Sequence, residues 1–311
     1  MQENLLNDNQ NKKIRVGIVR VLRDTEGDNT LSKAGEIFEF LNEYLGDKYK
    51  PLDIFVDRDN VWHISGIPIM PADLIHRVDV VWNQDYPDLS QLFSQIGIPY
   101  ISTNPFLYVL ENNKISLKKH VKDIGLYMPS SLVLEAYQED IDGDIDTYSL
   151  KKAGEVFSRF GAPWIVRTNT DKNNEGVHVV KTFPDLINII RDFAIHKKNI
   201  LVEELIKGDR VSIHTVSNFR DENIYHFLPK NISDIHKNEI LIHVKNLWKE
   251  LNPKHYLNID FILHPKRIYL NNISSSFDFK KDNRFHSMAT DFGVKSHDII
   301  ENIIKNAILN K

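Results

Sequence analysis

The chain has 311 residues, 41% of them hydrophobic and 26% charged, and its formal net charge is -4. This composition is typical of a globular protein with two or three cores and excludes a disordered or fibrous chain. The weak negative charge gives no reason to expect nucleic acid or an anionic membrane as a partner. Because the sequence has no cysteine, disulfides, thiolate zinc sites and cysteine nucleophiles are excluded.

The first dozen residues are polar and rich in asparagine, and they lack the apolar core of a signal peptide. No later stretch approaches the ~18 to 20 consecutive apolar residues that span a bilayer. We therefore expect a cytoplasmic protein that does not enter a membrane, with a disordered N-terminus over residues 1–12.

Strands and helices alternate over residues 13–105. Apolar and β-branched runs predict strands at 14–22, 52–56, 61–64, 74–82 and 98–101, and helical spacing predicts helices at 31–45 and 89–96. The run 61–64 either continues the strand before it or pairs with it as a hairpin. This alternation predicts a parallel α/β domain. In such sheets the loops at the carboxyl ends of the strands line the ligand crevice, which indicates residues 23–30 and 83–86.

The stretch from 104 to 160 is predicted to be mainly helical. The expected helices are 104–109, 114–124 and 150–160, the last closed by Gly161 as its C-cap. The acidic segment 139–148 resembles a calcium loop, but Gly143 falls at its fourth position and the final glutamate is misplaced. We therefore interpret 139–148 as a solvated loop.

From Pro163 onward the pattern becomes antiparallel. The expected strands are 164–167, 177–181, 200–205, 211–216 and 224–228, and the expected helices are 184–194, 239–251 and 298–309. Strands joined by short turns and flanked by amphipathic helices predict an α+β region.

Residues 256–276 are predicted to form a hairpin that turns at His264-Pro265-Lys266-Arg267. A turn centred near Lys266 places Asp260 across from Asn272. The predicted apolar face carries Ile259, Phe261, Leu263, Tyr269 and Ile273. The other face carries Asn258, Asp260, Asn272 and Ser274 at its open end and Ile262 and Leu270 nearer the turn. This pattern fits either an ordinary half-solvated sheet or a cluster of polar functional groups.

Three stretches, taken in order, resemble the D-alanine:D-alanine ligase family of the ATP-grasp superfamily. The first is IGIPYISTNPFLYVLENNKISLKKHVKDIGLYMPSS at 96–131. The second comprises PWIVRTNTDKNNEGVHVVKT and ILVEELIKGDRVSI within 163–213. The third runs from the hairpin to FHSMATDFG at 285–293. Together they cover most of the chain in collinear order.

This resemblance implies a three-lobed ATP-grasp fold of mixed α/β and α+β class, with an N-terminal parallel α/β (pre-ATP-grasp) domain. The implied boundaries are 13–105 for the N-terminal domain, 106–205 for the central lobe and 206–311 for the C-terminal lobe. In the family, ATP phosphorylates the carboxylate of one D-alanine, and the amine of a second attacks the acyl phosphate. The resemblance therefore implies ATP and Mg2+ as cofactors and an amino acid or peptide as a small-molecule substrate.

The resemblance also implies a nucleotide site between the last two lobes. Lys114 falls on the family's first phosphate-binding lysine, and Arg167 replaces the second lysine while keeping its charge. The other implied nucleotide-binding residues are Glu203 near the adenine amine, Glu204, Ile206, and Arg210 in place of a ribose-binding glutamate. The phosphate-covering loop, at 172–176, lacks the family's leading glycine and both hydroxyls.

The catalytic and metal-binding positions implied by the resemblance are altered more strongly. Asn258 stands where the family has its catalytic arginine, and Asp28 is the nearest match to its D-alanine-binding glutamate. The implied metal-binding residues are Asp260, Asn272 and Ser274, and only Asp260 keeps its charge. One carboxylate with two neutral oxygens is expected to hold one Mg2+ at most.

Two functions fit these residues. The first is ATP-dependent carboxylate:amine ligation of the D-alanine:D-alanine type with impaired activity, in a protein that could form a homodimer, as is common in the family. The second is a non-catalytic ATP-grasp scaffold or regulatory protein that binds nucleotide weakly or not at all. His214, His226, His243 and His255 do not show the spacing of a metal-ligand set, and we interpret them as structural or solvated.

Overall fold

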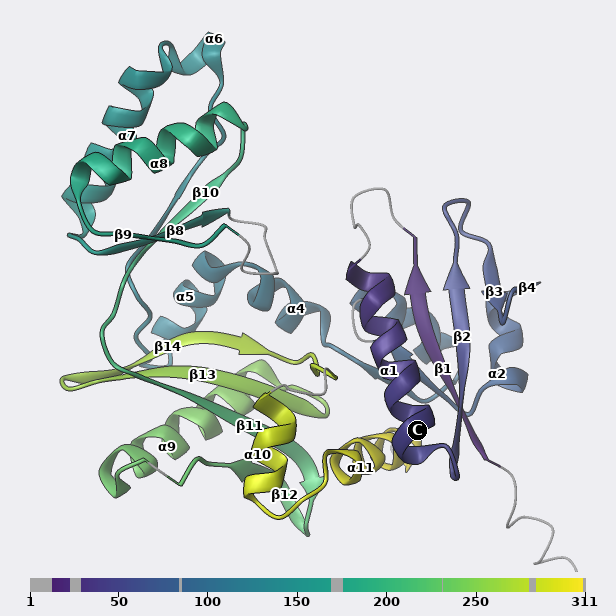
Figure 1. Ribbon diagram of the computed structural model, residues 1–311. Coiled ribbons are helices and arrows are strands. Elements are labelled where there is room, and N and C mark those ends of the chain that lie inside the picture. Colours follow the sequence, from purple (N-terminus) through teal and green to yellow (C-terminus); the bar gives the residue numbers. More distant parts are fainter. Residues whose placement is uncertain are drawn as a thin grey trace, which may run out of the picture. The chain divides into compact units, whose positions relative to one another are not determined.

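The computed structural model describes residues 13–22, 29–83, 86–168, 176–230, 232–279 and 284–309 (Figure 1). The chain forms two compact units. Unit 1 comprises Met1–Glu111, Ser212–Ile259 and Ile273–Lys311, and unit 2 comprises Asn112–Val211 and Asp260–Asn272. Each unit is therefore assembled from segments that lie far apart in the sequence. None of the described helices is long and apolar enough to cross a membrane.

Unit 1 contains a six-stranded sheet in the order β4-β3-β2-β1-β5-β6. The strands are β1 (Ile14–Val21), β2 (Tyr49–Val56), β3 (Trp62–Ile64), β4 (Ile67–Ile69), β5 (Val80–Asn83) and β6 (Tyr100–Ser102). β1 is parallel to both β2 and β5, and β5 is parallel to β6, so the predicted parallel α/β arrangement is confirmed. β3 is antiparallel to β2, which shows that the run near 61–64 forms a hairpin.

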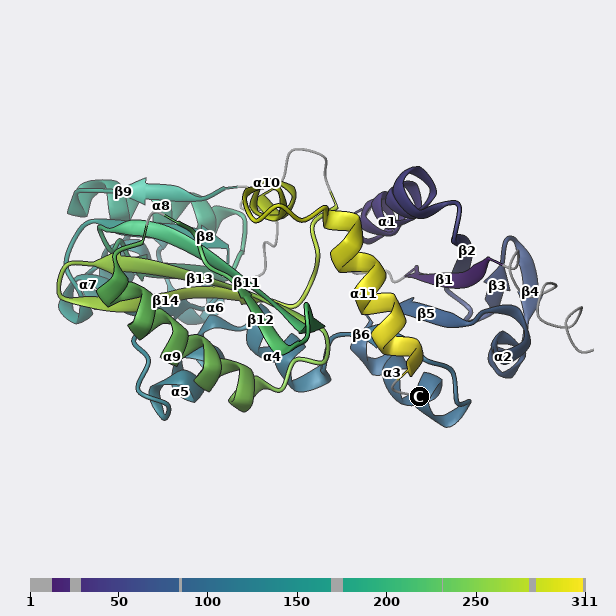
Figure 2. The same cartoon turned by 90° about the horizontal axis from the view of Figure 1, so that it is seen from below.

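Helices cover both faces of this sheet because side chains along each strand alternate between two apolar cores. Val16 and Ile18 of β1 share one core with α1 (Asn29–Leu45) and α11 (Ser296–Leu309). Val19 and Val21 share the other core with α2 (Leu74–Arg77) and α3 (Ser90–Gln95). Figure 2 shows α11 across β5 and β6, so the last helix of the chain returns to its first sheet.

A second sheet has the order β12-β11-β13-β14. Its strands are β11 (Asp209–Phe219), β12 (Glu222–Phe227), β13 (Tyr256–His264) and β14 (Arg267–Ser274). β13 and β14 are neighbours, which confirms the predicted hairpin. Ile259, Phe261 and Ile273 are buried as expected, whereas Leu263 and Tyr269 nearer the turn are partly exposed. The helix α9 (Asp234–Leu251) precedes this hairpin and α10 (Arg284–Asp291) follows it.

Unit 2 contains a four-stranded antiparallel sheet in the order β7-β10-β8-β9. Its strands are β7 (Ser131–Leu134), β8 (Trp164–Thr168), β9 (His178–Val180) and β10 (Ile200–Glu204). The helices α7 (Ile145–Arg159) and α8 (Phe183–Ile195) lie side by side over one face (Figure 1). Trp164, Val166 and Val202 pack against Val156 and Ile190 of these helices.

Three α-helices and two single 3-10 turns complete the described elements. They are α4 (Pro105–Asn112), α5 (Lys114–Lys122), α6 (Glu139–Asp142), η2 (Pro71–Asp73) and η3 (Pro87–Leu89). Most of the predicted helices and strands are found within a few residues of their expected bounds. The division into three lobes stays a prediction.

The strand predicted at 74–82 is wrong in its first half. Leu74–Arg77 forms the short helix α2, and β5 begins only at Val80. Leu74 and Val78, four residues apart, are both buried, while Ile75 is 42% exposed. The run is therefore a helical turn that buries one side. A run this short does not show whether its apolar residues follow the period of a helix or of a strand.

The loop predicted at 139–148 is also wrong. Residues 139–142 form α6, and α7 already begins at Ile145. Asp144 is the N-cap of α7, where its carboxylate accepts a hydrogen bond from the Thr147 backbone N–H at 3.0 Å. Asp142 accepts one from the Gln138 backbone N–H at 2.9 Å. The aspartates thus satisfy the open amides of helix starts.

Gly161 does not act as the C-cap of α7. The helix ends at Arg159, and its C-cap is Phe160 in an extended conformation. The elements β4, β7 and α10 were not predicted, and each is short or lies in a polar stretch.

Candidate functional site

The face of the unit 2 sheet opposite α7 and α8 carries both apolar and charged side chains. The core residues of β8 and β10 point to the helices, so alternation turns their neighbours to this open face. Leu201 pairs with Arg167 and Glu203 pairs with Ile165, so these four side chains lie on the same face. The oppositely charged Arg167 and Glu203 therefore lie among apolar side chains on this face.

Glu203 lies at the centre of an ion-pair cluster. Lys114 Nζ donates to Glu203 Oε1 at 2.9 Å and to Oε2 at 3.2 Å, and Arg167 Nε donates to Oε2 at 3.3 Å. The Lys114 and Arg167 side chains are each 16% exposed and that of Glu203 is 7% exposed. Little water reaches these charges, so they interact more strongly than a surface ion pair. The structure thus brings three of the predicted nucleotide residues together.

Lys114 reaches this cluster because α5 begins at it. Asn113 is the N-cap of α5, and its side chain accepts a hydrogen bond from the Ser116 backbone N–H at 3.0 Å. This cap satisfies one of the open amides of the first turn. The side chain of Lys114 is thereby projected from a fixed helix start toward the open face of the sheet.

The cluster contains more positive than negative charge. Burial lowers the pKa of Lys114, whereas Glu203 raises it by favouring the ammonium. The charges of Arg167 and Arg210 lower the pKa of Lys114 further, so both lie close enough to act on it. These four residues carry three positive charges and one negative charge. An anion that binds beside Glu203 would meet this excess of positive charge.

The remaining predicted nucleotide residues lie at the end of β10 and in the chain that follows it. Glu204 is outside the ion-pair cluster, because its carboxylate accepts a hydrogen bond from the Ser130 backbone N–H at 3.4 Å. Ile206 is partly buried and Arg210 is exposed. Glycine is required at Gly208, because a Cβ atom there would lie 2.5 Å from the carbonyl oxygen of Leu263. The turn before Arg210 therefore packs directly against the backbone of β13.

The predicted hairpin residues occupy alternate positions on β13 and β14. Asn258, Asp260, Asn272 and Ser274 are all partly exposed. Asp260 and Asn272 belong to unit 2, and Asn258 and Ser274 belong to unit 1. Asp28 lies outside the described residues. Over the part of the chain that is described, no group of three or more His, Asp or Glu residues is placed to hold a metal ion.

Two residues outside the predicted nucleotide-binding set, Val179 and Lys118, also lie on or beside this face. Val179 on the edge strand β9 pairs with Ile165 and is 54% exposed. Lys118 lies one turn beyond Lys114, and its Nζ donates to the Pro129 carbonyl at 2.8 Å. Burial lowers the pKa of Lys118, and the charges of the nearby Glu204 and Glu203 carboxylates offset part of this effect by raising it. Lys118 stands four residues after Lys114, and this spacing places both side chains on the same face of a helix.

The chain is similar to D-alanine--D-alanine ligases both in sequence and in structure. No family model matches the chain. It is 22% identical to the D-alanine--D-alanine ligase of Desulforamulus reducens over 318 residues, which span 95% of this chain and 99% of that one. It is 20% identical to the D-alanine--D-alanine ligase of Oceanobacillus iheyensis over 361 residues, covering 95% of each chain.

Solved structures show the same likeness at the level of the fold. The crystal structure of D-alanyl-alanine synthetase A from Vibrio cholerae matches with a TM-score of 0.72 at 17% identity, covering 96% of this chain and 99% of that one. The D-alanine--D-alanine ligase from Bacillus anthracis complexed with ATP matches with a TM-score of 0.65 at 16% identity, covering 96% and 97%. The chain therefore has the ATP-grasp fold of the D-alanine--D-alanine ligases, which it resembles over nearly its whole length.

Proposed function

We propose that this chain is an ATP-grasp protein of the D-alanine ligase type that binds the phosphates of ATP through Lys114 and Arg167 and has impaired ligase activity. The observation that carries the proposal is that Lys114 and Arg167, from separate elements of unit 2, converge on Glu203. Transfer of a phosphoryl group depends mainly on positioned cations that neutralise developing charge. Two neighbouring cations on one sheet face supply such positioning.

The surroundings of this cation pair suit the rest of a nucleotide. Ile165 and Val179 present apolar surface on the same face, and Val179 is 54% exposed. A flat purine ring that covers these side chains would remove apolar area from water, at about 25 cal/mol per Å². The nucleotide would then place its base on the apolar side chains and its phosphates on the cations.

The hairpin residues fit one Mg2+ ion. Within unit 2, Asp260 of β13 offers a carboxylate and Asn272 of β14 offers an amide oxygen. Magnesium is often held by one or two carboxylates together with nucleotide phosphates and water. In this proposal the ion supplies charge neutralisation for the phosphates, and Asp260 is the protein's charged ligand.

Impaired ligation follows from the residues that replace charged groups of the family. Asn258 carries no positive charge to stabilise the charge that develops during acyl transfer. By analogy with a lost oxyanion donor, this loss costs about 2.7 to 4 kcal/mol, or ~100 to 1000-fold in rate. Any remaining substrate is proposed to be an amino acid or a small peptide.

One observation favours a second function, that of a non-catalytic scaffold. Glu203 already pairs with both Lys114 and Arg167, so a nucleotide phosphate has to compete with this carboxylate for the same cations. If Glu203 stays paired with Lys114 and Arg167, the protein would bind nucleotide weakly. It could then use the fold to contact a partner instead.

Calorimetric titration with Mg-ATP tests the first proposal. We expect the wild-type chain to bind ATP and Lys114→Ala to weaken binding by about tenfold or more, since a charge-assisted hydrogen bond contributes about 1.5 to 3 kcal/mol. Lys119→Ala on the same helix is the matched control, because this side chain is exposed. Absence of binding heat for the wild type would overturn the proposal in favour of the scaffold.

A phosphate-release screen with D-amino acids separates the ligase from the scaffold. The ligase function predicts ATP hydrolysis that depends on an added amino acid and collapses in Asp260→Asn. If the chain binds ATP but no amino acid stimulates phosphate release, the protein binds nucleotide without ligating, and the ligase function is excluded for those substrates.

A further inference from the structure

The hydroxyl of Tyr100, the first residue of β6, is held by two groups from other segments of unit 1. Lys254 Nζ donates a hydrogen bond to Tyr100 Oη at 2.9 Å. Ser94 Oγ in α3 shares a second hydrogen bond with the same oxygen, also at 2.9 Å. All three residues belong to unit 1. One phenol oxygen thus contacts both an ammonium and a hydroxyl group.

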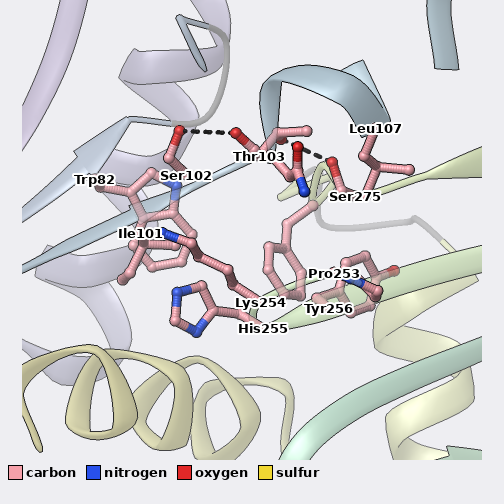
Figure 3. Close-up of a pocket in the computed structure, with 12 residues that line it drawn as sticks. Trp82, Ile101, Ser102, Thr103, Leu107, Pro253, Lys254, His255, Tyr256 and Ser275 are labelled. Carbon is pink, nitrogen blue, oxygen red and sulfur yellow. Dashed lines mark hydrogen bonds between the residues drawn. The ribbon is translucent and has the colours of Figure 1, made fainter. Parts of the chain in front are cut away.

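The position of Lys254 beside Tyr100 is fixed by its surroundings. Its ammonium lies 4.3 Å from the centroid of the Tyr100 ring, a distance at which a cation is attracted to an aromatic ring. The backbone of Lys254 is bonded to Ser217 of β11, whose hydroxyl donates to the Lys254 carbonyl at 3.0 Å. Lys254 and the next residue, His255, line a pocket with Ile101, which follows Tyr100 in β6 (Figure 3). The segment that carries the ammonium is therefore anchored next to β6.

The Lys254 ammonium has a phenol rather than a carboxylate as its hydrogen-bond partner. Within the described part of the chain, Lys254 forms no ion pair with an aspartate or glutamate. A cation that contacts an acceptor favours the negatively charged form of that acceptor. The Ser94 hydroxyl suits both forms, because it can accept from the neutral phenol and donate to the phenolate. Loss of the phenol proton would therefore create an ion pair that the neutral state lacks.

The pKa of Tyr100 follows from these contacts. Burial raises it, but the hydrogen bonds from Lys254 and Ser94 and the positive charge of Lys254 outweigh burial, so the pKa of Tyr100 lies below its ordinary value of 10.0. In Tyr49 of β2 the opposite holds, because burial raises the pKa and the nearby Glu301 carboxylate raises it further. His255 also lies near Tyr100, but its ring bonds to the Tyr100 backbone rather than to the hydroxyl. Tyr100 thus loses its proton more readily than an isolated tyrosine.

We propose that Tyr100 is a nucleophilic modification site, which accepts an acyl group from an activated carboxylic acid derivative. The phenol proton first passes to water, and the phenolate oxygen, stabilised by Lys254, then attacks the acyl carbon. The new carbon–oxygen bond forms as the bond to the leaving group breaks, the leaving group takes up a proton from water, and the product is an aryl ester. Ser94 and Lys254 are exposed and Tyr100 is partly exposed, so a small reagent can reach the oxygen. This site goes beyond the proposed function, because it is independent of the nucleotide residues in unit 2.

Acetylation of the whole chain by N-acetylimidazole tests this site. The measured quantity is the rate of acetylation of Tyr100 relative to that of Tyr127, which is 54% exposed, obtained by mass spectrometry of the peptides at pH 8. Lys254→Met keeps a long apolar side chain and removes the charge. It is expected to lower this ratio about threefold or more, because a pKa higher by one unit leaves about tenfold less phenolate. By analogy with thiolates, the greater nucleophilicity of a more basic anion offsets part of this loss.

Two further variants and one reagent serve as controls. Lys249→Met, at an exposed position of α9, is the matched control and should leave the ratio unchanged. Lys254→Arg keeps the positive charge and is expected to retain most of the wild-type ratio. Hydroxylamine should remove the acetyl group from Tyr100, since it cleaves an aryl ester but not the amide of an acetylated lysine.

Three results would overturn the proposal. An equal ratio in the wild type and in Lys254→Met would show that the ammonium does not activate Tyr100. A ratio that Lys254→Arg lowers as much as Lys254→Met would show a merely structural role for the lysine. An acetyl group that stays on the Tyr100 peptide after hydroxylamine treatment would show that no aryl ester had formed.

Discussion

Lys114 and Glu203 form an ion pair in which one ammonium contacts both carboxylate oxygens, at 2.9 and 3.2 Å. Arg167 shares the second oxygen at 3.3 Å. Glu203 therefore keeps two cations side by side that would otherwise repel each other. In the absence of a phosphate, this carboxylate supplies the negative charge that the cations need. We expect the cluster to stabilise unit 2, and in the proposed function the same cations bind the nucleotide phosphates.

Glu203→Gln is predicted to destabilise the ligand-free protein by about 3 kcal/mol, because it leaves two cations poorly solvated without their counter-ion. Pyrophosphate should recover more stability in this variant than in the wild type, since the anion replaces the missing charge. Urea unfolding with and without pyrophosphate measures both effects.

The matched control is Glu204→Gln, because the Glu204 carboxylate bonds to the Ser130 backbone and is outside the cluster. A loss of less than about 1 kcal/mol is expected for this control. Equal stabilities for wild type and Glu203→Gln would show that the cluster does not depend on this charge.

Gly208→Ala is predicted to destabilise the protein by about 1 to 3 kcal/mol. The added Cβ would lie 2.5 Å from the Leu263 carbonyl oxygen, so the turn or β13 would have to move. Gly154→Ala is the control, because no atom lies within 4 Å of a Cβ at this position in α7. It should stabilise the helix by up to about 1 kcal/mol. Urea unfolding of both variants decides the prediction, and a neutral Gly208→Ala would contradict the close approach.

His255 lines a pocket in unit 1 together with Trp82 and Tyr256 (Figure 3). Burial, assisted by the charge of Lys254, lowers the pKa of His255 from 6.5 to about 4. Between these two values the unfolded chain binds a proton that the folded chain does not. Stability is therefore complete above the ordinary pKa and is lost as the pH falls through this window, by up to about 1.4 kcal/mol per pH unit.

His255→Gln removes this proton uptake. Its free energy of unfolding should fall less steeply than that of the wild type between about pH 6.5 and pH 4.5. Chemical denaturation at several pH values in this range gives the two slopes. Parallel slopes would show that His255 is not held neutral by the fold.

The fold was largely predictable because the period of the side chains is a local property. Ile259 and Phe261 alternate with Asn258 and Asp260, and burial in the structure follows this alternation. The failures were also local. The four residues of α2 are too few to show helical spacing, and the aspartates before α7 could be read either as loop residues or as helix caps.

The candidate site was predictable only in part, since its contacts join residues far apart in sequence. The resemblance indicated Lys114, Arg167 and Glu203 singly, but the pairing of Lys114 with Glu203 spans 89 positions and has no local signal.

In the proposed function, Lys114 and Arg167 together bind the phosphates of a nucleotide. Calorimetric affinities for ATP, ADP and AMP at one ionic strength test it most directly. Because each phosphate adds charge-assisted contacts, ATP should bind about tenfold or more tightly than AMP, with ADP between them. Equal affinities for ATP and AMP, or no binding of either, would contradict the claim.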